Sequence, residues 1–288
     1  MRKYPESLDL HMHSTVSDGT DTPEEILKAV KQAGIKMFAV TDHDTFDACA
    51  MIRRLLAPGD PVYVNGIEFS CKDEEGQYHI LGYRFDEEDP GIRHVVEQGH
   101  LYRVNKMQAR LDHLKSEFGI EFSKDDVEKV RNMQSGGKPH LANLLVKYGH
   151  AGSVNEAFHR FLNKLHTGAE YVRPEEAIEG ILSAGGIPVL AHPSFGSGNE
   201  LVFGENMNRR LKRLTGFGLQ GVEAFYSGFT PEIQQEMLDF AGQYELYISA
   251  GSDYHGLNKT VKLLENHLGD PNNGPEGLKR FLDELLKD

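Results

Sequence analysis

The stretch SLDLHMHSTVSDGTDTPEEILKAVKQAGIKMFAVTD (residues 7–42) decides the fold, because it contains a strand, a helix and a second strand. Its two ends have the length and composition of strands. Between them, Thr22 offers an N-cap hydroxyl, Pro23 suits the first helical position, and Glu25 stands three residues after the cap. Apolar residues then recur on one face until Gly34, which predicts the end of the helix.

Strand and helix signals alternate in the same way along much of the chain. Further helices with a proline at the start are predicted after Arg173 and Thr230. Alternation of this kind predicts an α/β fold with a mainly parallel sheet, and seven strands suit a barrel. The predicted strands are Ser7–His13, Met37–Asp42, Val62–Ser70, Tyr78–Phe85, Ile187–Ala191, Gly221–Phe225 and Glu245–Ala250.

The middle of the chain has little strand pattern. It contains amphipathic helical stretches instead, at 104–118, 124–133 and 140–148, and a further helix start at Ser153. We therefore predict a barrel built from residues 1–97 and 171–288, with residues 98–170 inserted as a helical cap over one end.

The overall composition of the chain indicates which kinds of binding partner are expected. The 44 acidic residues outnumber the 31 basic ones and give a net charge of -13, whereas a protein that grips duplex DNA usually has a basic surface. Cys49 and Cys71 form no cysteine framework, which favours a reducing compartment. No apolar signal segment or run of roughly 18 apolar residues is present. We expect a cytoplasmic protein, a monomer by default, that binds neither membrane nor duplex DNA.

Histidines and carboxylates stand where the first strands end. His11 and His13 lie two apart, so on a strand both side chains point to one face and can bind one metal ion. Asp18 follows in the next loop, at the end of the strand where barrel enzymes hold their sites. His43 follows the second apolar strand directly. Histidines that face solvent and a capping turn are the alternatives for these two motifs.

Glu68 stands among apolar neighbours in the third strand, where an unpaired buried carboxylate is costly and needs a cation. A metal ion and a simple ion pair are both open. His79 in the next strand is a weaker candidate, since a lone strand histidine is often a core residue. His192 ends a later apolar run, and Asp253 and His255 follow the last strand. Together these positions place a histidine, aspartate or glutamate at the C-terminal end of six separate predicted strands.

The ordered motifs HxH…SDG, TDHD, GIEFS, HILGY, AHP and SDYH, which run from Ser7 to His255, resemble those of the PHP (polymerase and histidinol phosphatase) family. The resemblance implies a distorted (β/α)7 barrel that binds up to three divalent ions. The insertion is similar to that of stand-alone PHP phosphoesterases, which act on nucleotides and small phosphorylated metabolites.

The resemblance also implies a complete set of ligands. The first ion would be held by His11, His13, Glu68 and Asp253, the second by Glu68, His79 and His192, and the third by Asp18, His43 and His255. Nitrogen and oxygen donors without thiolate suit Mn, Fe or Zn. Asp9, Asp42 and Asp44 are candidates to orient the histidine rings, with exposed turn residues as the alternative.

Two neighbouring ions can lower the pKa of a bridging water, so that hydroxide forms near neutral pH and attacks phosphorus. No GxSxG motif is present, which fits direct attack by water rather than a covalent intermediate. The expected catalytic residues are Glu68, Asp253, His192 and His140.

The insertion should supply contacts to the substrate. Lys138 and His140 are candidates to bind a phosphate or to protonate the leaving group, and Asn143 and Arg173 are candidates for further contacts. Related members carry arginine in the motif around Lys138, and lysine cannot make the bidentate fork of arginine. The resemblance to these members therefore does not identify the substrate of this chain.

Three functions follow from these motifs. The leading prediction is hydrolysis of a phosphate mono- or diester in a small molecule, either a nucleotide bisphosphate or a phosphorylated or cyclic sugar phosphate. A 5′-to-3′ exoribonuclease that acts on short RNA is the enzymatic alternative, and the acidic balance of the chain counts against it. A metal-binding scaffold without catalysis is the alternative of another class, and the complete ligand set counts against that.

Overall fold

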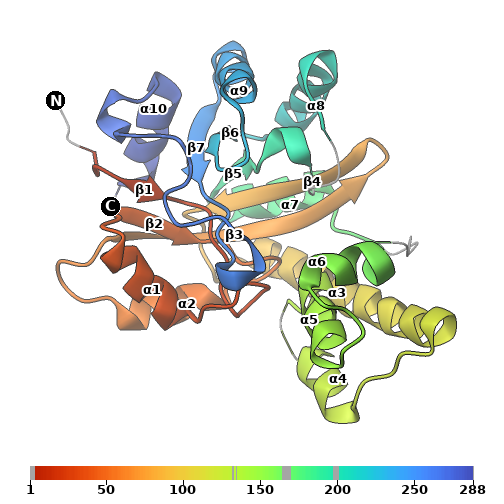
Figure 1. Cartoon of the computed structure of the whole chain (residues 1–288). Coiled ribbons are helices and arrows are strands. Elements are labelled where there is room, and N and C mark those ends of the chain that lie inside the picture. The colour runs from red at the N-terminus through yellow and green to blue at the C-terminus, as the bar shows by residue number, and fades with distance from the viewer. Residues whose placement is uncertain (1–3, 132, 134, 164–169, 197–200, 288) are drawn as a thin grey trace.

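A computed structural model describes residues 4–131, 133, 135–163, 170–196 and 201–287 (Figure 1). Seven strands form one sheet in sequence order, with helices packed outside it. The strands are β1 (Leu8–Asp9), β2 (Met37–Val40), β3 (Val62–Asp73), β4 (Gly76–Tyr83), β5 (Ile187–Leu190), β6 (Gly221–Tyr226) and β7 (Tyr247–Gly251). The seven predicted strands are therefore present, with ends that shift by a few residues.

In the described part of the chain six helices pack around the strands. They are α1 (Pro23–Gln32), α2 (Asp47–Leu55), α7 (Pro174–Ser183), α8 (Gly204–Gly216), α9 (Pro231–Gln243) and α10 (Glu276–Leu285). Three of the six, α1, α7 and α9, begin at the proline that their start signals predict. In α1 the Glu25 amide donates to the Thr22 hydroxyl at 3.2 Å, and the Glu25 carboxylate accepts from the Thr22 amide at 2.8 Å. Within the described residues we find no helix with the length and apolar character of a membrane span.

The sheet is parallel except at β4, which runs antiparallel to both of its neighbours. Only Glu74 and Glu75 separate β3 from β4, and a parallel connection needs a crossover of a dozen residues or more. The two strands therefore form a long hairpin, which projects from the barrel in Figure 1. A strictly alternating (β/α)7 order is thus broken at this one strand.

The sheet closes on itself between its first and last strands. The Leu10 amide donates to the Ala250 carbonyl at 3.0 Å, and the Asp253 amide donates to the His11 carbonyl at 2.8 Å. A parallel bridge between Met12 and Tyr254 continues this contact. The predicted α/β barrel is confirmed as a distorted, nearly closed barrel of seven strands.

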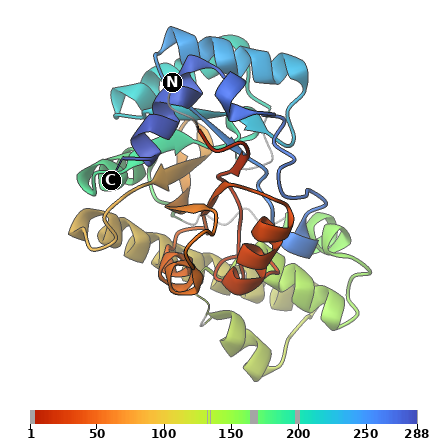
Figure 2. The same ribbon diagram turned by 90° about the vertical axis from the view of Figure 1, so that its left-hand side faces the viewer.

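Between residues 90 and 162 the described chain forms several helices, and most of them share an apolar cluster of their own. These are α3 (Pro90–Phe118), α4 (Lys124–Arg131), α5 (Lys138–Lys147), α6 (Val154–Ala157) and the π-helix η1 (Phe158–Leu162). Buried Met107, Leu141 and Phe161 belong to this cluster, which is separate from the barrel core. Both views show α4–α6 at the end of the molecule that lies away from α9 and α10 (Figures 1 and 2).

Barrel closure leaves no room for a side chain at Gly251. A Cβ atom there would lie 2.1 Å from the His11 Cβ and 2.8 Å from a Glu223 carboxylate oxygen. Gly242 in α9 is a matched contrast, because a Cβ there would have no neighbour within 4 Å.

We expect Gly251→Ala to lower the free energy of unfolding by about 1–3 kcal/mol, because an overpacked site forces its neighbours to move. Gly242→Ala should be neutral or stabilising by about 0.5–1 kcal/mol, because alanine favours a helix. Urea denaturation of the two variants measures the difference. Equal stability of both variants would contradict the packing described for the closure.

Candidate metal centre

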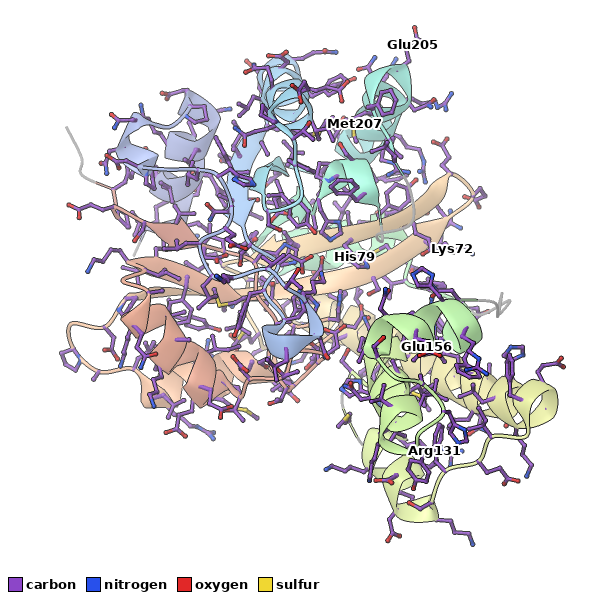
Figure 3. All side chains as sticks on the ribbon, in the orientation of Figure 1. Lys72, His79, Arg131, Glu156, Glu205 and Met207 are labelled. Atoms are coloured by element: carbon purple, nitrogen blue, oxygen red, sulfur yellow. The ribbon has the colours of Figure 1, made fainter. Side chains whose placement is uncertain are left out.

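The nine metal ligands predicted from the sequence lie together at one end of the barrel. They form four overlapping groups whose possible ligand atoms lie within 4.8 Å of one another. The groups are His13, Asp18, His43 and His255; His11, Glu68 and His192; His11, His13 and Asp253; and His43, Glu68 and His79. In Figure 3 the labelled His79 lies beside the β3–β4 hairpin.

Glu68 lies at the centre of this cluster and is 1% exposed. Its Oε1 is 3.0 Å from His79 Nδ1, 3.1 Å from His192 Nε2 and 3.3 Å from His11 Nε2. Its Oε2 is 3.0 Å from His43 Nδ1 and 3.2 Å from His13 Nε2. One carboxylate thus faces five imidazoles.

Two further carboxylates extend the cluster towards the last strand. Asp253 Oδ1 lies 3.3 Å from His255 Nδ1 and 3.4 Å from His13 Nε2. Asp18 Oδ1 lies 3.3 Å from His255 Nε2, and Asp18 Oδ2 lies 3.8 Å from His43 Nε2. His255 therefore connects the two carboxylates.

His79 reaches the cluster by a different route from the one its strand position predicts. We expected it at the C-terminal end of a strand, but it lies near the start of β4. Because β4 is antiparallel, its first residues lie at the barrel end where the parallel strands finish. The hairpin thus places His79 opposite Glu68.

Three residues of the site have a backbone conformation that is rare outside glycine. The φ angles are 52° at Asp44, 26° at His192 and 59° at Asp253. Each residue follows a strand and turns the chain sharply at the barrel mouth. Strained backbone of this kind tends to gather at functional sites.

The nitrogen and oxygen atoms of the cluster are suited to bind metal ions. His11 Nε2, His13 Nε2, His43 Nδ1, His192 Nδ1 and Glu68 Oε2 are enclosed without an aligned hydrogen bond. Buried polar atoms normally have a partner, because leaving one without a partner costs about 1–3 kcal/mol. Imidazole nitrogens and carboxylate oxygens that converge in this way are the donor set of a divalent transition-metal site.

The buried carboxylates of the cluster also need positive charge close to them. Burial alone would raise the pKa of Glu68, but His79, His43 and His11 hold it well below its usual value. Burial opposes protonation of His13, yet Asp253 and Glu68 outweigh it and raise the pKa of that ring to about 9. The buried carboxylates therefore stay ionised and need cations, which either protonated rings or metal ions can supply.

Glu223 on β6 is a buried residue that the sequence analysis missed. Its Oε1 lies 3.0 Å from His11 Nδ1, and its Oε2 accepts from the His192 amide at 2.7 Å. It therefore orients the ring of one ligand and the backbone of another, a role that supports metal binding. The signal was present, because Glu223 stands among apolar strand residues just as Glu68 does.

Asp253 is held by two further residues that the sequence analysis missed. The Tyr226 hydroxyl donates to Asp253 Oδ2 at 3.0 Å, and the Lys259 ammonium donates to the same oxygen. These contacts leave Oδ1 to face the histidines. No motif in the sequence marks either residue.

Asp9, Asp42 and Asp44 are all buried rather than exposed in turns. Their hydrogen bonds stabilise the loops that carry the ligands, and within the described residues these hydrogen bonds do not involve the imidazole rings themselves. Asp42 accepts from the Ser14 amide at 2.8 Å, Asp9 from the Ser252 amide at 2.9 Å and Asp44 from the Ser70 amide at 2.9 Å.

A cavity of about 170 Å³ opens from the cluster towards α3 and α5. Its lining includes Asp18, His43 and His79 of the cluster and the cations Arg103, Lys106, Arg110 and Lys138. The three cations of α3 were not singled out from the sequence, because they look like the solvated face of an amphipathic helix.

The four predicted substrate contacts lie in different places. Lys138 lines the cavity. His140 follows two residues later in α5, and its Nδ1 accepts from the Gly137 amide at 3.0 Å. Asn143 is exposed on α5, and Arg173 is paired with Glu74 and Glu175.

Comparison with known proteins gives relatives over nearly the whole chain. A phosphoribosyl 1,2-cyclic phosphate 1,2-diphosphodiesterase from Eggerthella lenta is 31% identical over 86% of this chain and 94% of its own length. A 3′,5′-nucleoside bisphosphate phosphatase from Chromobacterium violaceum is 27% identical, covering 86% and 87%. A 5′-3′ exoribonuclease from Haemophilus influenzae is 28% identical, covering 86% and 89%.

A solved structure has the same architecture. A Bifidobacterium adolescentis protein, assigned as a metal-dependent phosphoesterase, superimposes with a TM-score of 0.84 at 25% identity over 99% of each chain. The family model of the PHP domain matches residues 9–184. With this match and the relative at 31% identity, the chain belongs to the PHP domain family.

Proposed function

We propose that this chain uses divalent metal ions to hydrolyse a phosphate mono- or diester of a small molecule. The cluster of nine histidines and carboxylates around Glu68, at the mouth of the barrel, carries this proposal. The relatives support it, since they are named as a cyclic phosphodiesterase, a bisphosphate phosphatase and exoribonucleases. A nucleotide bisphosphate and a phosphorylated or cyclic sugar phosphate are the substrate classes we propose.

The proposed cofactors are two to three ions of Mn, Fe or Zn. His11, His13, Glu68 and Asp253 would hold the first, Glu68, His79 and His192 the second, and Asp18, His43 and His255 the third. Bound ions would acidify a water molecule and neutralise negative charge on the phosphate. Glu68, Asp253 and His192 are catalytic in this proposal because they would position the ions.

Side chains of the protein would bind the substrate and transfer protons. Lys138 lines the cavity and would attract a phosphate as a point charge. His140 Nδ1 accepts a hydrogen bond, so a neutral ring carries its proton on Nε2 and can donate it to a leaving oxygen. Burial lowers the pKa of His140, which favours the neutral ring.

We propose that residues 98–170 act as a cap that shapes the substrate pocket. The separate apolar cluster of this segment and its contribution of Lys138 to the cavity support that role. Asn143 and Arg173 remain candidates for contacts with larger substrates. The thiols of Cys49 and Cys71 are buried and unpaired, which supports a reducing compartment such as the cytoplasm.

Exoribonuclease activity on short RNA is the second candidate, because curated relatives from Haemophilus influenzae and Escherichia coli carry that name. The net charge of -13 favours a small substrate over a long polyanion.

Metal analysis together with phosphate release from a panel tests the proposed function. The panel contains 3′,5′-nucleoside bisphosphates, cyclic sugar phosphates, histidinol phosphate and a short 5′-phosphorylated RNA. We expect two to three ions per chain and turnover of a small phosphoester. His11→Ala and Asp253→Ala should lose both metal and activity, since each removes a donor from the cluster. His94→Ala, at an exposed position of α3, is the control that should keep both. A folded protein that takes up none of the three metals would refute the proposal.

Glu223→Gln tests whether a residue that orients the metal ligands, without being one of them, contributes to metal binding. The variant keeps the shape of the side chain but removes the negative charge that faces His11 Nδ1. We expect metal affinity to fall by about 10–100-fold, as is typical when a group that orients a ligand is lost. Competition with a chelating dye measures the affinity. An unchanged affinity would show that Glu223 has no part in metal binding.

A further inference from the structure

Helix α3 connects the barrel to the cap as one continuous element (Figure 1). Its first turns pack into the barrel core through Ile92 and Val95. Its later turns pack into the separate apolar cluster of the cap through Met107 and Leu114. Between these two regions, α3 packs against the loop that follows β2 and carries His43.

Gly99 and Arg103, one helical turn apart, make this contact through Asp44. A Cβ atom at Gly99 would lie 3.1 Å from the Asp44 Cβ, so the backbone of α3 packs directly against the aspartate. Arg103 donates from Nε to Asp44 Oδ2 and from Nη2 to the Ser70 hydroxyl at 2.7 Å. The Ser70 amide donates to Asp44 Oδ1 at 2.9 Å. Both carboxylate oxygens of Asp44 therefore accept hydrogen bonds within one closed network.

Asp44 connects this network to the metal centre. Its amide donates to the Glu68 carbonyl at 2.9 Å, and a parallel bridge joins His43 to Glu68. The chain then turns at Asp44 with a φ angle of 52°, a conformation that persists only where the surroundings fix it. Among the described residues, Arg103 is the one ion-pair partner of this buried aspartate. Arg103 thus stabilises the turn that places His43 Nδ1 3.0 Å from Glu68 Oε2.

The guanidinium of Arg103 also lies close to the start of α5. A Cβ atom at Gly137 would be 3.4 Å from Arg103 Nη1. Gly137 is the N-cap residue of α5 and directly precedes Lys138. One side chain therefore lies against the loop of a predicted metal ligand, strand β3 and the cap helix that lines the cavity.

We propose that Arg103 is a positioning residue, which fixes His43 in the metal centre through Asp44 and Ser70. The inference rests on the proposed function, because it assumes that His43 binds a metal ion. A direct contact with the substrate is the alternative role, since Arg103 lines the cavity. The hydrogen bonds from its Nε and Nη2 to the barrel favour positioning, because they direct two of the three guanidinium nitrogens away from a ligand.

Hydrogen exchange of the metal-free, full-length protein tests the positioning directly. In Arg103→Met the buried carboxylate of Asp44 loses its partner, so residues 43–46 should exchange faster by about tenfold or more. Exchange in α9 should not change, which would show that the barrel stays folded. Arg93→Met is the matched control, because it removes an exposed arginine of the same helix that pairs with Glu88. Its exchange at residues 43–46 should equal that of the wild type.

Arg103→Lys keeps the proposal testable if Arg103→Met does not fold. Lysine retains the positive charge but cannot donate to Asp44 and Ser70 through the fork of a guanidinium. We expect exchange at residues 43–46 to lie between the rates of the wild type and Arg103→Met. Exchange at the wild-type rate in every folded Arg103 variant would overturn the proposal.

Metal affinity then relates the contact to the metal centre. Competition with a chelating dye is measured with whichever of Mn²⁺, Fe²⁺ or Zn²⁺ the wild type binds. We expect affinity to fall by about 10–100-fold in Arg103→Met, as is typical when a group that orients a ligand is lost, and part of it to return in Arg103→Lys. A lower Tm with unchanged affinity of the folded protein would indicate a merely structural role and would overturn the proposal.

Two further outcomes separate this proposal from its alternatives. A raised KM, with exchange and metal affinity as in the wild type, would identify Arg103 as a substrate contact and contradict positioning. If the wild type takes up no metal, the proposed function fails. The exchange measurement still decides, in that case, whether Arg103 fixes the loop that carries His43.

Discussion

A single buried carboxylate, Glu68, sets the constraint on which the site depends. It has almost no exposure to water, and five imidazoles lie within 3.3 Å of its oxygens. A charge in such a position is tolerated only when cations surround it. The strands and loops at this end of the barrel place imidazoles around Glu68, and neighbouring side chains hold those imidazoles in position.

The barrel meets this constraint by two topological features. Parallel strands deliver His43, His192 and Asp253 at their C-terminal ends, where barrel sites are usually found. The antiparallel β4 strand delivers His79 from its beginning. Closure between β1 and β7 brings His11 against Gly251, and the missing side chain at Gly251 gives the His11 ring the space to reach Glu68 and Glu223.

Much of this arrangement could be predicted from the sequence, because apolar strands that end in histidine or aspartate are a local pattern. The direction of β4 was missed, although the two residues between Asp73 and Gly76 allow only a hairpin. Glu223 was missed although it shares the signal of Glu68. Arg103, Lys106 and Arg110 could not be predicted, since their periodicity is that of an exposed helix and only the packing of α3 against the barrel buries them. The pairing of Arg173 with Glu74 likewise depends on residues that are distant in the sequence.

One cavity is thus lined both by residues of the candidate metal centre and by fixed cations of α3 and α5. The most direct test of the metal cluster is anomalous X-ray diffraction from crystals grown with Mn²⁺, recorded above and below the manganese absorption edge. Anomalous peaks bounded by Glu68, the surrounding histidines, Asp18 and Asp253 are the predicted result. A correctly folded barrel that has no anomalous density at Glu68 with Mn²⁺, nor with Fe²⁺ or Zn²⁺ at their own absorption edges, would contradict the central claim.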